Sequence, residues 1–390
     1  MTPPGPSRKL VSQYVALKQG GPFQLTSTPY PIPGPEEICV RNRAVGLNPL
    51  DVKTLYQGLM PVVQKWPEVL GIDAAGVVEA VGDNVTDFKA GDAVFSLAGF
   101  GGKAGAFQDV MVVPTHFAAK KPSSWTFEEA SSVPICYLAA AACLLKGLSL
   151  RLPFMQDPPK DLLAGPDRVA YVDDASNPPS PNIFRKPSLV PAPPPNNNDK
   201  IRSILVLGGS SGVGSSAIQL LRQVLGPAVT ILSTNSPANN THLMKLGATA
   251  CINRNDNTGS KLVSAIKAAT PDGKGVDAIL DAVSAAEADK MVFEALSSRG
   301  PKLYCQVMTG PGKVDAPNDV RAAAQPVFGR MTFEAPGGRR AMSRLAELVE
   351  AGNYKLPLRV EVVGKGLEAI PNGLEKLRDG VSGTKLVVSL

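Results

Sequence analysis

Residues 204–214 read Ile-Leu-Val-Leu-Gly-Gly-Ser-Ser-Gly-Val-Gly, so an aliphatic run is followed at once by a glycine-rich loop. The aliphatic run predicts a buried strand. The segment Ser215–Leu225 predicts a helix, because four apolar residues between Ala217 and Val224 fall on one face. Glycines between a strand and a helix let backbone N–H groups approach a pyrophosphate, and the positive end of the helix points at the same place. Since both flanking elements are present, we predict a dinucleotide-binding loop rather than a plain glycine turn.

The chain downstream of this loop alternates strands and helices. Strands are predicted over residues 229–232, 278–280 and 302–307, and a helix over residues 261–269. This alternation is typical of a parallel, doubly wound sheet with helices on both faces, the Rossmann arrangement. A further helix near residues 340–351 and a last strand near the C-terminus follow. We therefore predict an α/β protein.

The end of the second strand indicates which dinucleotide binds. Enzymes that use NAD place Asp or Glu there to accept a hydrogen bond from the ribose 2′-hydroxyl. This chain has Ser233, Thr234, Asn235 and Ser236 instead, and Arg254 follows the next predicted strand. Hydroxyl, amide and guanidinium groups can donate to a 2′-phosphate that a carboxylate would repel. We therefore predict NADP(H) as the cofactor; the alternative is that these residues only form a turn.

The N-terminal part is rich in strand formers and glycine turns up to about residue 125. Thr126 and Glu129 have the spacing of a capping box, which predicts a helix start, and Pro134 predicts a break or a new start. Residues 151–200 then hold 12 of the 36 prolines, and neither a helix nor a strand ladder can run through such a segment. We predict an irregular surface insertion, either without a role or as a docking element.

Composition limits the class of protein. At 390 residues the chain is longer than one core usually serves, which predicts two domains. The net charge is +6 and its Lys/Arg clusters are no larger than pairs, which argues against nucleic acid binding. No run approaches the roughly 20 apolar residues of a membrane span, and the first ten residues lack the apolar core of a secretion signal. Five scattered cysteines predict reduced thiols, so we expect a cytoplasmic protein that contacts no membrane.

Four motifs occur in the order found in medium-chain dehydrogenases/reductases, and the chain resembles that superfamily over nearly its whole length apart from the insertion. The motifs are Gly46–Lys53, Pro67–Gly76, Phe88–Val94 and Gly208–Gly214. Within the superfamily the chain resembles the zinc-independent quinone oxidoreductases and enoyl reductases. Its strongest likeness is to the trans-acting enoyl reductases of fungal polyketide synthases of the lovastatin type.

The resemblance implies a GroES-like, β-rich catalytic domain beside a Rossmann domain, with the site in the cleft between them. The implied bounds are 1–145 for the N-terminal part of the catalytic domain and 146–200 for the insertion. Residues 201–330 would form the NADP-binding domain, and residues 331–390 would return to the catalytic domain.

The resemblance also implies which residues meet the cofactor and the substrate. The nicotinamide end would contact Asn48, Pro49, Leu50 and Asp51, and the pyrophosphate would lie on Ser210, Ser211, Gly212, Val213 and Gly214. Gly383 and Thr384, with Lys385, would close over the cofactor. An acyl pocket would be lined by Cys136, Tyr137, Leu138, Ala139, Ala140, Ala141, Ala142 and Cys143, with Gly337 and Gly338 adding little bulk nearby. The alternative for this run of small residues is close helix packing. Many relatives have a tyrosine at the position of Arg254, so that contact departs from the pattern.

The supply of metal ligands is poor. A catalytic zinc needs three ligands from Cys, His or Asp/Glu. The chain has only two histidines, His116 and His242, and Asn48 lies near the position of a zinc-binding Cys in the superfamily's alcohol dehydrogenases. Their four-Cys lobe is missing as well. We therefore predict no metal, and an activated C=C bond as the hydride acceptor.

Addition of a hydride to an α,β-unsaturated thioester leaves an enolate, which needs a nearby donor and a proton at the α-carbon. Lys53 is the first candidate because it follows the Asn-Pro-Leu-Asp turn, and the alternative is a solvated surface lysine. Tyr56 is the second candidate, and the alternative is a packing tyrosine. Water is a third possible proton source.

Together these inferences predict an NADPH-dependent oxidoreductase acting on a CH–CH bond. We expect a trans-acting enoyl reductase that takes its acyl substrate from the carrier domain of a polyketide synthase in fungal secondary metabolism. One alternative is a quinone or alkenal reductase for free small molecules, and another is a non-catalytic nucleotide-binding partner of a synthase. The resemblance leads us to expect a monomer.

Overall fold

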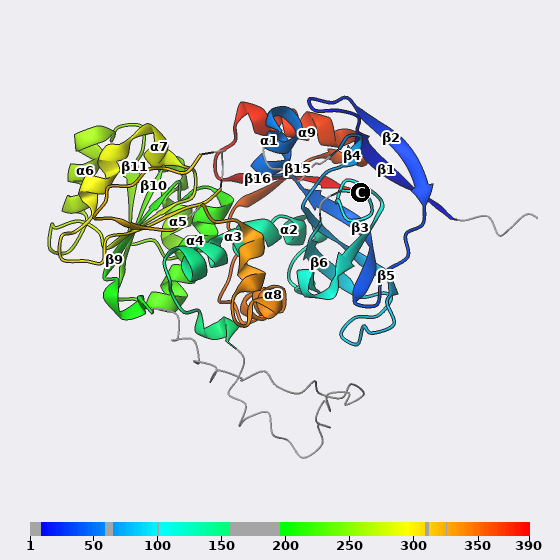
Figure 1. Ribbon diagram of the computed structural model, residues 1–390, viewed down its shortest axis with the longest axis horizontal. Coiled ribbons are helices and arrows are strands. Elements are labelled where there is room, and N and C mark those ends of the chain that lie inside the picture. The colour runs from blue at the N-terminus through cyan, green and yellow to red at the C-terminus, as the bar shows by residue number, and fades with distance from the viewer. Residues whose placement is uncertain (1–8, 59–64, 100, 157–195, 309–311, 325) are drawn as a thin grey trace, which may run out of the picture.

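The computed structural model describes residues 9–58, 65–99, 101–156, 196–308, 312–324 and 326–390. Most of the predicted proline-rich insertion, residues 157–195, lies outside the described residues. Two bodies lie side by side along the long axis (Figure 1). The half that contains the predicted dinucleotide-binding loop, residues 208–214, is in green and yellow and is called the nucleotide-binding half. The β-rich half is in blue and cyan. The red C-terminal strands lie with the β-rich half (Figure 1).

The nucleotide-binding half is built on a parallel sheet in the order β11-β10-β9-β12-β13-β14. Its strands are β9 (Ser203–Leu207), β10 (Thr230–Asn235), β11 (Ala250–Asn253), β12 (Ala278–Asp281), β13 (Leu303–Gln306) and β14 (Arg321–Ala322). The order reverses direction between β9 and β12, and ligands of such sheets bind in the crevice at that switch point. The predicted doubly wound parallel sheet is therefore confirmed.

Alternation of side chains along β9 explains why both faces of this sheet are covered. Ile204 and Val206 belong to the apolar cluster that includes α4, whereas Leu205 and Leu207 belong to the cluster that includes α6. The helices of this half are α4 (Gly212–Leu225), α5 (Asn240–Leu246), α6 (Gly259–Ala268) and α7 (Ala285–Ala288). Helix α4 begins three residues before the predicted Ser215, because the Ser211 hydroxyl accepts from the Gly214 N–H at 3.0 Å and caps the helix.

The β-rich half contains a mixed sheet in the order β15-β16-β3-β5-β6-β8, with β7 also paired to β3, and a small sheet β2-β1-β4. The strands are β1 (Leu10–Ala16), β2 (Phe23–Pro29), β3 (Glu37–Gly46), β4 (Glu68–Val69), β5 (Asp73–Val81), β6 (Ala93–Leu97), β7 (Val110–Pro114), β8 (Ala118–Lys120), β15 (Arg359–Lys365) and β16 (Thr384–Ser389). Because β16 pairs antiparallel with β3, the last residues of the chain lie beside the end of β3. This pairing places Lys385 near the turn that follows Gly46.

Further helices complete the core. They are α1 (Pro49–Gln57), α2 (Phe127–Ser131), α3 (Pro134–Ala142) with the π-turn η2 (Cys143–Gly147), α8 (Ala341–Glu350) and α9 (Ile370–Asp379). Short 3-10 turns are η1 (Thr115–Phe117), η3 (Pro153–Met155), η5 (Asn198–Lys200), η6 (Pro237–Asn239), η7 (Lys290–Ala295), η8 (Gly329–Glu334), η9 (Gly338–Arg340) and η10 (Leu367–Ala369). The predicted capping box at Thr126 is formed, and Pro134 starts α3.

The segment Phe127–Gly147 is long and apolar enough to cross a membrane by composition, but 78% of its apolar window is buried inside the protein. Helix α3 packs against α4 of the nucleotide-binding half, and Figure 1 shows it between the two bodies. This segment is a core element of the fold.

Candidate functional site

The glycine-rich loop is held on the neighbouring strand β10. The Gly208 N–H donates to the Thr234 hydroxyl at 3.1 Å, and the Gly209 N–H donates to the Thr234 carbonyl at 3.0 Å. A Cβ on Gly209 would overlap the Ser233 hydroxyl, and one on Gly214 would overlap the carbonyl oxygen of Gly208, so side chains do not fit here.

The first turn of α4 offers donors to an anion. The N–H groups of Gly212 and Val213 have no intrahelical acceptor, as in the first turn of any helix, whereas Ser211 caps Gly214. Ser210, Ser211, Gly212 and Val213 are partly exposed, whereas Gly214 is buried. The first four of the five predicted pyrophosphate residues therefore line an accessible loop at the positive end of a 14-residue helix. These residues fit the pyrophosphate of a dinucleotide.

The turn after β12 borders the same switch point. The buried Asp281 carboxylate accepts from the N–H groups of Ala285 and Ala286, each at 2.9 Å, and from the Tyr304 hydroxyl at 3.2 Å. These bonds shape a turn in which Val283 packs against Gly208 while its own surface stays 44% exposed. Sequence reasoning missed Val283, since a lone valine after a strand gives no signal of its own.

The residues predicted to select NADP(H) divide into two groups. Ser233, Thr234 and Asn235 are buried in β10, and their polar groups are used inside the protein: Ser233 donates to Asn235 at 2.8 Å, and Thr234 holds the glycine loop. Burial therefore assigns these three to building the site. Ser236, just past the strand, is partly exposed.

Arg254 lies beside Ser236 at the same sheet edge. Its backbone N–H donates to the Asn235 carbonyl at 3.2 Å, and its side chain is exposed. The C-terminal turn lies against this loop too, because Asn239 donates to the Ser382 hydroxyl at 3.1 Å and contacts Gly383. The structure thus brings together Ser236, Arg254 and the predicted Gly383 segment. Asn239 and Ser382 were not predicted.

A buried polar cluster joins the first turn of α1 to the C-terminal strand. The Lys385 ammonium donates to the Asn48 amide oxygen and to the Asp73 carboxylate at 3.0 Å, and Cys136 Sγ lies 4.0 Å from it. Burial works against the charge of Lys385, but Cys136 and the Asp73 carboxylate outweigh it and raise its pKa. Asp73 lies within the motif Pro67–Gly76 but is not among the predicted site residues. An acidic residue in an apolar strand is itself an indication of a buried polar site.

Thr384, whose side chain is buried, follows the turn at Gly383 and precedes Lys385 in β16. Helix α1 borders a small hollow lined by Leu50, Asp51, Thr54, residues 69–72 and Gly101. Pro49 is the first residue of α1, and Asp51 accepts from the Asn48 N–H at 2.8 Å, so the predicted segment from Asn48 to Asp51 forms the capped start of this helix.

Lys53 and Tyr56 are both on α1, but their surroundings differ. Lys53 is half-buried, which lowers its pKa, and the charge of Glu287 in α7 opposes that shift. The Lys53 side chain is therefore within range of a charge on the nucleotide-binding half. The Tyr56 ring packs against the core with the Arg378 guanidinium 5.0 Å from its centroid, which favours the packing interpretation of this tyrosine.

The run predicted to line an acyl pocket is largely core. Tyr137, Leu138, Ala140, Ala141, Ala142 and Cys143 are 0% exposed, and Ala139 is 4% exposed. The Cβ of an added side chain at Gly338 would overlap the carbonyl oxygen of Thr332, so its lack of bulk serves backbone packing. This burial favours the alternative, close helix packing, for residues 137–143, and Cys136 lies against Gly212 and Lys385. An acyl pocket lined by this run stays a prediction.

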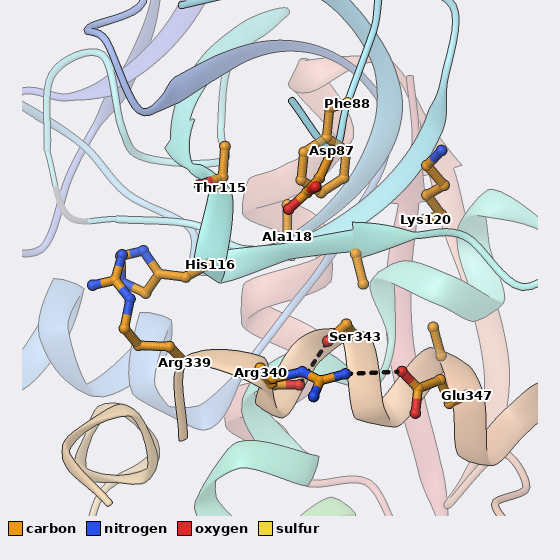
Figure 2. Close-up of a pocket in the computed structure, with 12 residues that line it drawn as sticks. Asp87, Phe88, Thr115, His116, Ala118, Lys120, Arg339, Arg340, Ser343 and Glu347 are labelled. Atoms are coloured by element: carbon orange, nitrogen blue, oxygen red, sulfur yellow. Dashed lines mark hydrogen bonds and ion pairs between the residues drawn. The ribbon is translucent and has the colours of Figure 1, made fainter. Parts of the chain in front are cut away.

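A separate groove of about 650 Å³ lies between η1–β8 and α8 (Figure 2). Four of its charged residues are in ion pairs. Arg340 pairs with Glu347 at 3.8 Å, as Figure 2 shows, Arg339 pairs with Glu36 at 3.8 Å, and Lys120 pairs with Asp92 at 3.5 Å. None of its lining residues belongs to the glycine loop or to the Lys385 cluster. We do not assign the reaction to this groove.

The prediction that no metal is bound concerns the polar cluster around Lys385, which includes Asn48. Among the described residues, no group of three or more His, Cys, Asp or Glu side chains is arranged to hold a metal ion. The amide oxygen of Asn48 accepts a hydrogen bond from the Lys385 ammonium. The expectation of a metal-free reaction remains a prediction.

Asp51 gives a pH-dependent prediction. Burial raises the pKa of its carboxyl to about 7. The negative charge of Asp73 also raises this pKa, whereas the hydrogen bonds from Asn48 lower it. Because the unfolded value is about 3.9, the folded state binds more protons between these pH values, and stability should fall as pH rises through that window by up to about 1.4 kcal/mol per pH unit. Asp51→Asn keeps an acceptor for the Asn48 N–H and should remove this slope in urea unfolding at pH 5 to 8. Asp83→Asn, at an exposed position, is the control; equal slopes in wild type and Asp51→Asn would contradict the prediction.

Comparison with known proteins gives the following matches. Residues 34–123 match the family model "Alcohol dehydrogenase GroES-like domain", and residues 212–347 match "Zinc-binding dehydrogenase". The chain is 31% identical to dehydrogenase orsE of Emericella nidulans over 96% of this chain and 97% of that protein. It is 30% identical to trans-enoyl reductase FMN2 of Fusarium mangiferae over 96% of this chain and 98% of that protein. The crystal structure of Escherichia coli quinone oxidoreductase with NADPH superposes with a TM-score of 0.69 at 20% identity, covering 97% of this chain and 100% of that one.

Proposed function

The chain belongs to the medium-chain dehydrogenase/reductase superfamily, and from that premise we propose that it is a trans-acting enoyl reductase using NADPH on a carrier-bound α,β-unsaturated thioester. Oxidoreductase chemistry with a nicotinamide cofactor follows from the family. The observation that carries the finer proposal is the half-buried Lys53 on α1, which lies within range of the charge of Glu287 in α7 of the nucleotide-binding half. The name of the Fusarium relative supports the same substrate class.

The chain's own residues supply binding and charge. Gly212 and Val213 would hold the pyrophosphate, while Ser236 and Arg254 would hold the 2′-phosphate. NADPH supplies a hydride when bound. The Lys53 ammonium would stabilise the negative charge that develops on the thioester oxygen, in a site where partial burial strengthens its effect. Lys53 also carries a proton that it can give to the α-carbon.

The partner and the compartment belong to the same proposal. A trans-acting reductase receives its substrate from the acyl carrier domain of a polyketide synthase, so we infer a cytoplasmic enzyme of fungal secondary metabolism that works as a monomer beside a synthase. The family relatives include a protein named as a trans-enoyl reductase, which supports this inference. A sedimentation measurement of the isolated chain tests the monomer.

The preference for NADPH over NADH is a direct prediction. Arg254→Gln should raise the Kd of NADPH about ten-fold, roughly 1.4 kcal/mol, and leave the Kd of NADH unchanged, because only NADPH carries the 2′-phosphate. Ser236→Asp should weaken NADPH binding further by charge repulsion. Fluorescence titration with both nucleotides gives the Kd values for wild type and for each variant. Arg321→Gln, an exposed arginine on β14, is the control, and equal losses for both nucleotides would exclude a 2′-phosphate contact.

The substrate class is tested with NADPH and a panel of acceptors, followed by the loss of reduced-nicotinamide absorbance. We expect turnover of enoyl-pantetheine and enoyl-carrier substrates, with the carrier-bound form preferred. Faster turnover of free alkenals or quinones would replace the proposal with a small-molecule reductase. Absence of NADPH binding would favour a non-catalytic partner of a synthase.

A further inference from the structure

The Lys385 ammonium is almost fully enclosed, with the residue 5% exposed. It contacts groups from three separate segments: the Asn48 amide that precedes α1, the Asp73 carboxylate that starts β5, and Cys136 near the start of α3. Its own strand, β16, comes from the C-terminal end of the chain. One cation therefore joins segments that are far apart in the sequence.

The Asn48 side chain extends this network of contacts. Its amide nitrogen donates to the Gly46 carbonyl at 3.2 Å and to the Asp73 carboxylate at 3.0 Å, which uses both of its hydrogens. Its oxygen accepts from Lys385. The polar groups of the Asn48 side chain are therefore used inside the protein, which fixes the residue that caps α1.

The same cluster reaches the phosphate loop. The second oxygen of Asp73 accepts from the Ile135 N–H in the first turn of α3 at 2.8 Å. The next residue, Cys136, packs its sulfur against Gly212, the first residue of α4, so tightly that a Cβ on Gly212 would overlap it. The starts of α1, α3 and α4 are thus connected through Lys385 and its three partners, Asn48, Asp73 and Cys136.

A purely stabilising role does not account for this arrangement. Replacing a buried ion pair by apolar residues of similar size is often neutral or stabilising, so the value of such a pair lies in the geometry that it fixes. Here the fixed element is the first turn of α1, one turn before Lys53.

We propose that Lys385 is a positioning residue for the enoyl reduction: with Asp73 it holds the first turn of α1, and therefore Lys53, against the loop that would bind the cofactor. The inference rests on the proposed function, because it concerns the geometry of that reaction. It assigns Lys385 no contact with substrate.

The test compares Lys385→Met, Asp73→Asn and the double variant with wild type. Each variant is measured for thermal stability, for NADPH affinity, and for kcat and KM with an enoyl-pantetheine. The fluorescence enhancement of bound NADPH is also measured, because it reports how rigidly the nicotinamide is held. Lys376→Met removes an exposed lysine of α9 that pairs with Glu361 of β15, and it is the matched control.

The single variants should lose stability because each leaves a buried partner uncompensated, and the neutral double variant should recover it. We expect Lys385→Met and the double variant to lose most of the fluorescence enhancement and about ten-fold or more in kcat, while the Kd of NADPH changes less than about three-fold. A double variant that recovers stability, enhancement and kcat together would show a merely structural pair and overturn the proposal. If wild type binds NADPH with the fluorescence enhancement but does not reduce an enoyl thioester, the proposed function is wrong. The positioning inference, which concerns that reaction, is then wrong as well. Retention of the enhancement in Lys385→Met removes the positioning inference alone.

Discussion

Replacing Lys53 with methionine is expected to lower kcat for an enoyl thioester by about 100-fold, the usual contribution of one general acid or charged donor. The Kd of NADPH should stay within about three-fold of wild type, because the phosphate-binding residues lie on the other half of the molecule. Methionine keeps the length and the apolar stem of lysine, so packing on α1 changes little. Steady-state kinetics with NADPH and an enoyl-pantetheine measure the effect.

Lys103→Met is the control for this variant, since Lys103 lies on the surface of the same half of the molecule and pairs with Glu37 at 2.8 Å. The pH profile adds a second readout. Partial burial lowers the pKa of Lys53, so the rate should fall as pH rises through a value below that of an ordinary lysine, and Lys53→Met should lack this limb. Turnover unchanged by Lys53→Met would leave water or another group as the donor.

The second large effect is expected for Gly214→Ala. A methyl group there would overlap the carbonyl oxygen of Gly208, a backbone atom that cannot move without displacing the loop. The first turn of α4 would then lose its alignment with the pyrophosphate, and we expect NADPH affinity to fall by about 30-fold or more, over 2 kcal/mol. Fluorescence titration measures the affinity, and circular dichroism confirms that the variant is folded.

The matched control is Gly312→Ala, because a methyl group at Gly312 meets no atom within 4 Å and the residue does not need a positive φ. NADPH affinity should be unchanged there. Equal affinities for Gly214→Ala and wild type would mean that the dinucleotide does not use this loop.

The nucleotide-binding half could be predicted from the sequence because its signals are local. The run from Ile204 to Gly214 contains a strand, a glycine loop and a helix start within eleven residues, and the alternation along β9 fixes which residues meet α4 and which meet α6. The start of α4 was placed three residues late, since the capping role of Ser211 depends on the conformation of the loop.

The site was harder to predict because it is made by long-range contacts. Lys385 meets Asn48 across 337 positions of the chain, and the pattern around either residue does not indicate the other. The run from Ala139 to Ala142 has the small side chains of a pocket lining and equally those of a tightly packed helix, and its burial against α4 favours the second. Ser233 to Asn235 likewise could not be recognised as buried until β10 was seen to extend to Asn235.

The central claim is that this chain passes a hydride from NADPH to the β-carbon of an enoyl thioester. It is tested most directly by incubating the enzyme with NADPH deuterated at the transferring C4 position and an enoyl-pantetheine, and locating the label in the product by mass spectrometry and NMR. One deuterium at the β-carbon and none at the α-carbon is the predicted result. A saturated product without deuterium, or label retained in the nicotinamide with the enoyl thioester unchanged, would contradict it.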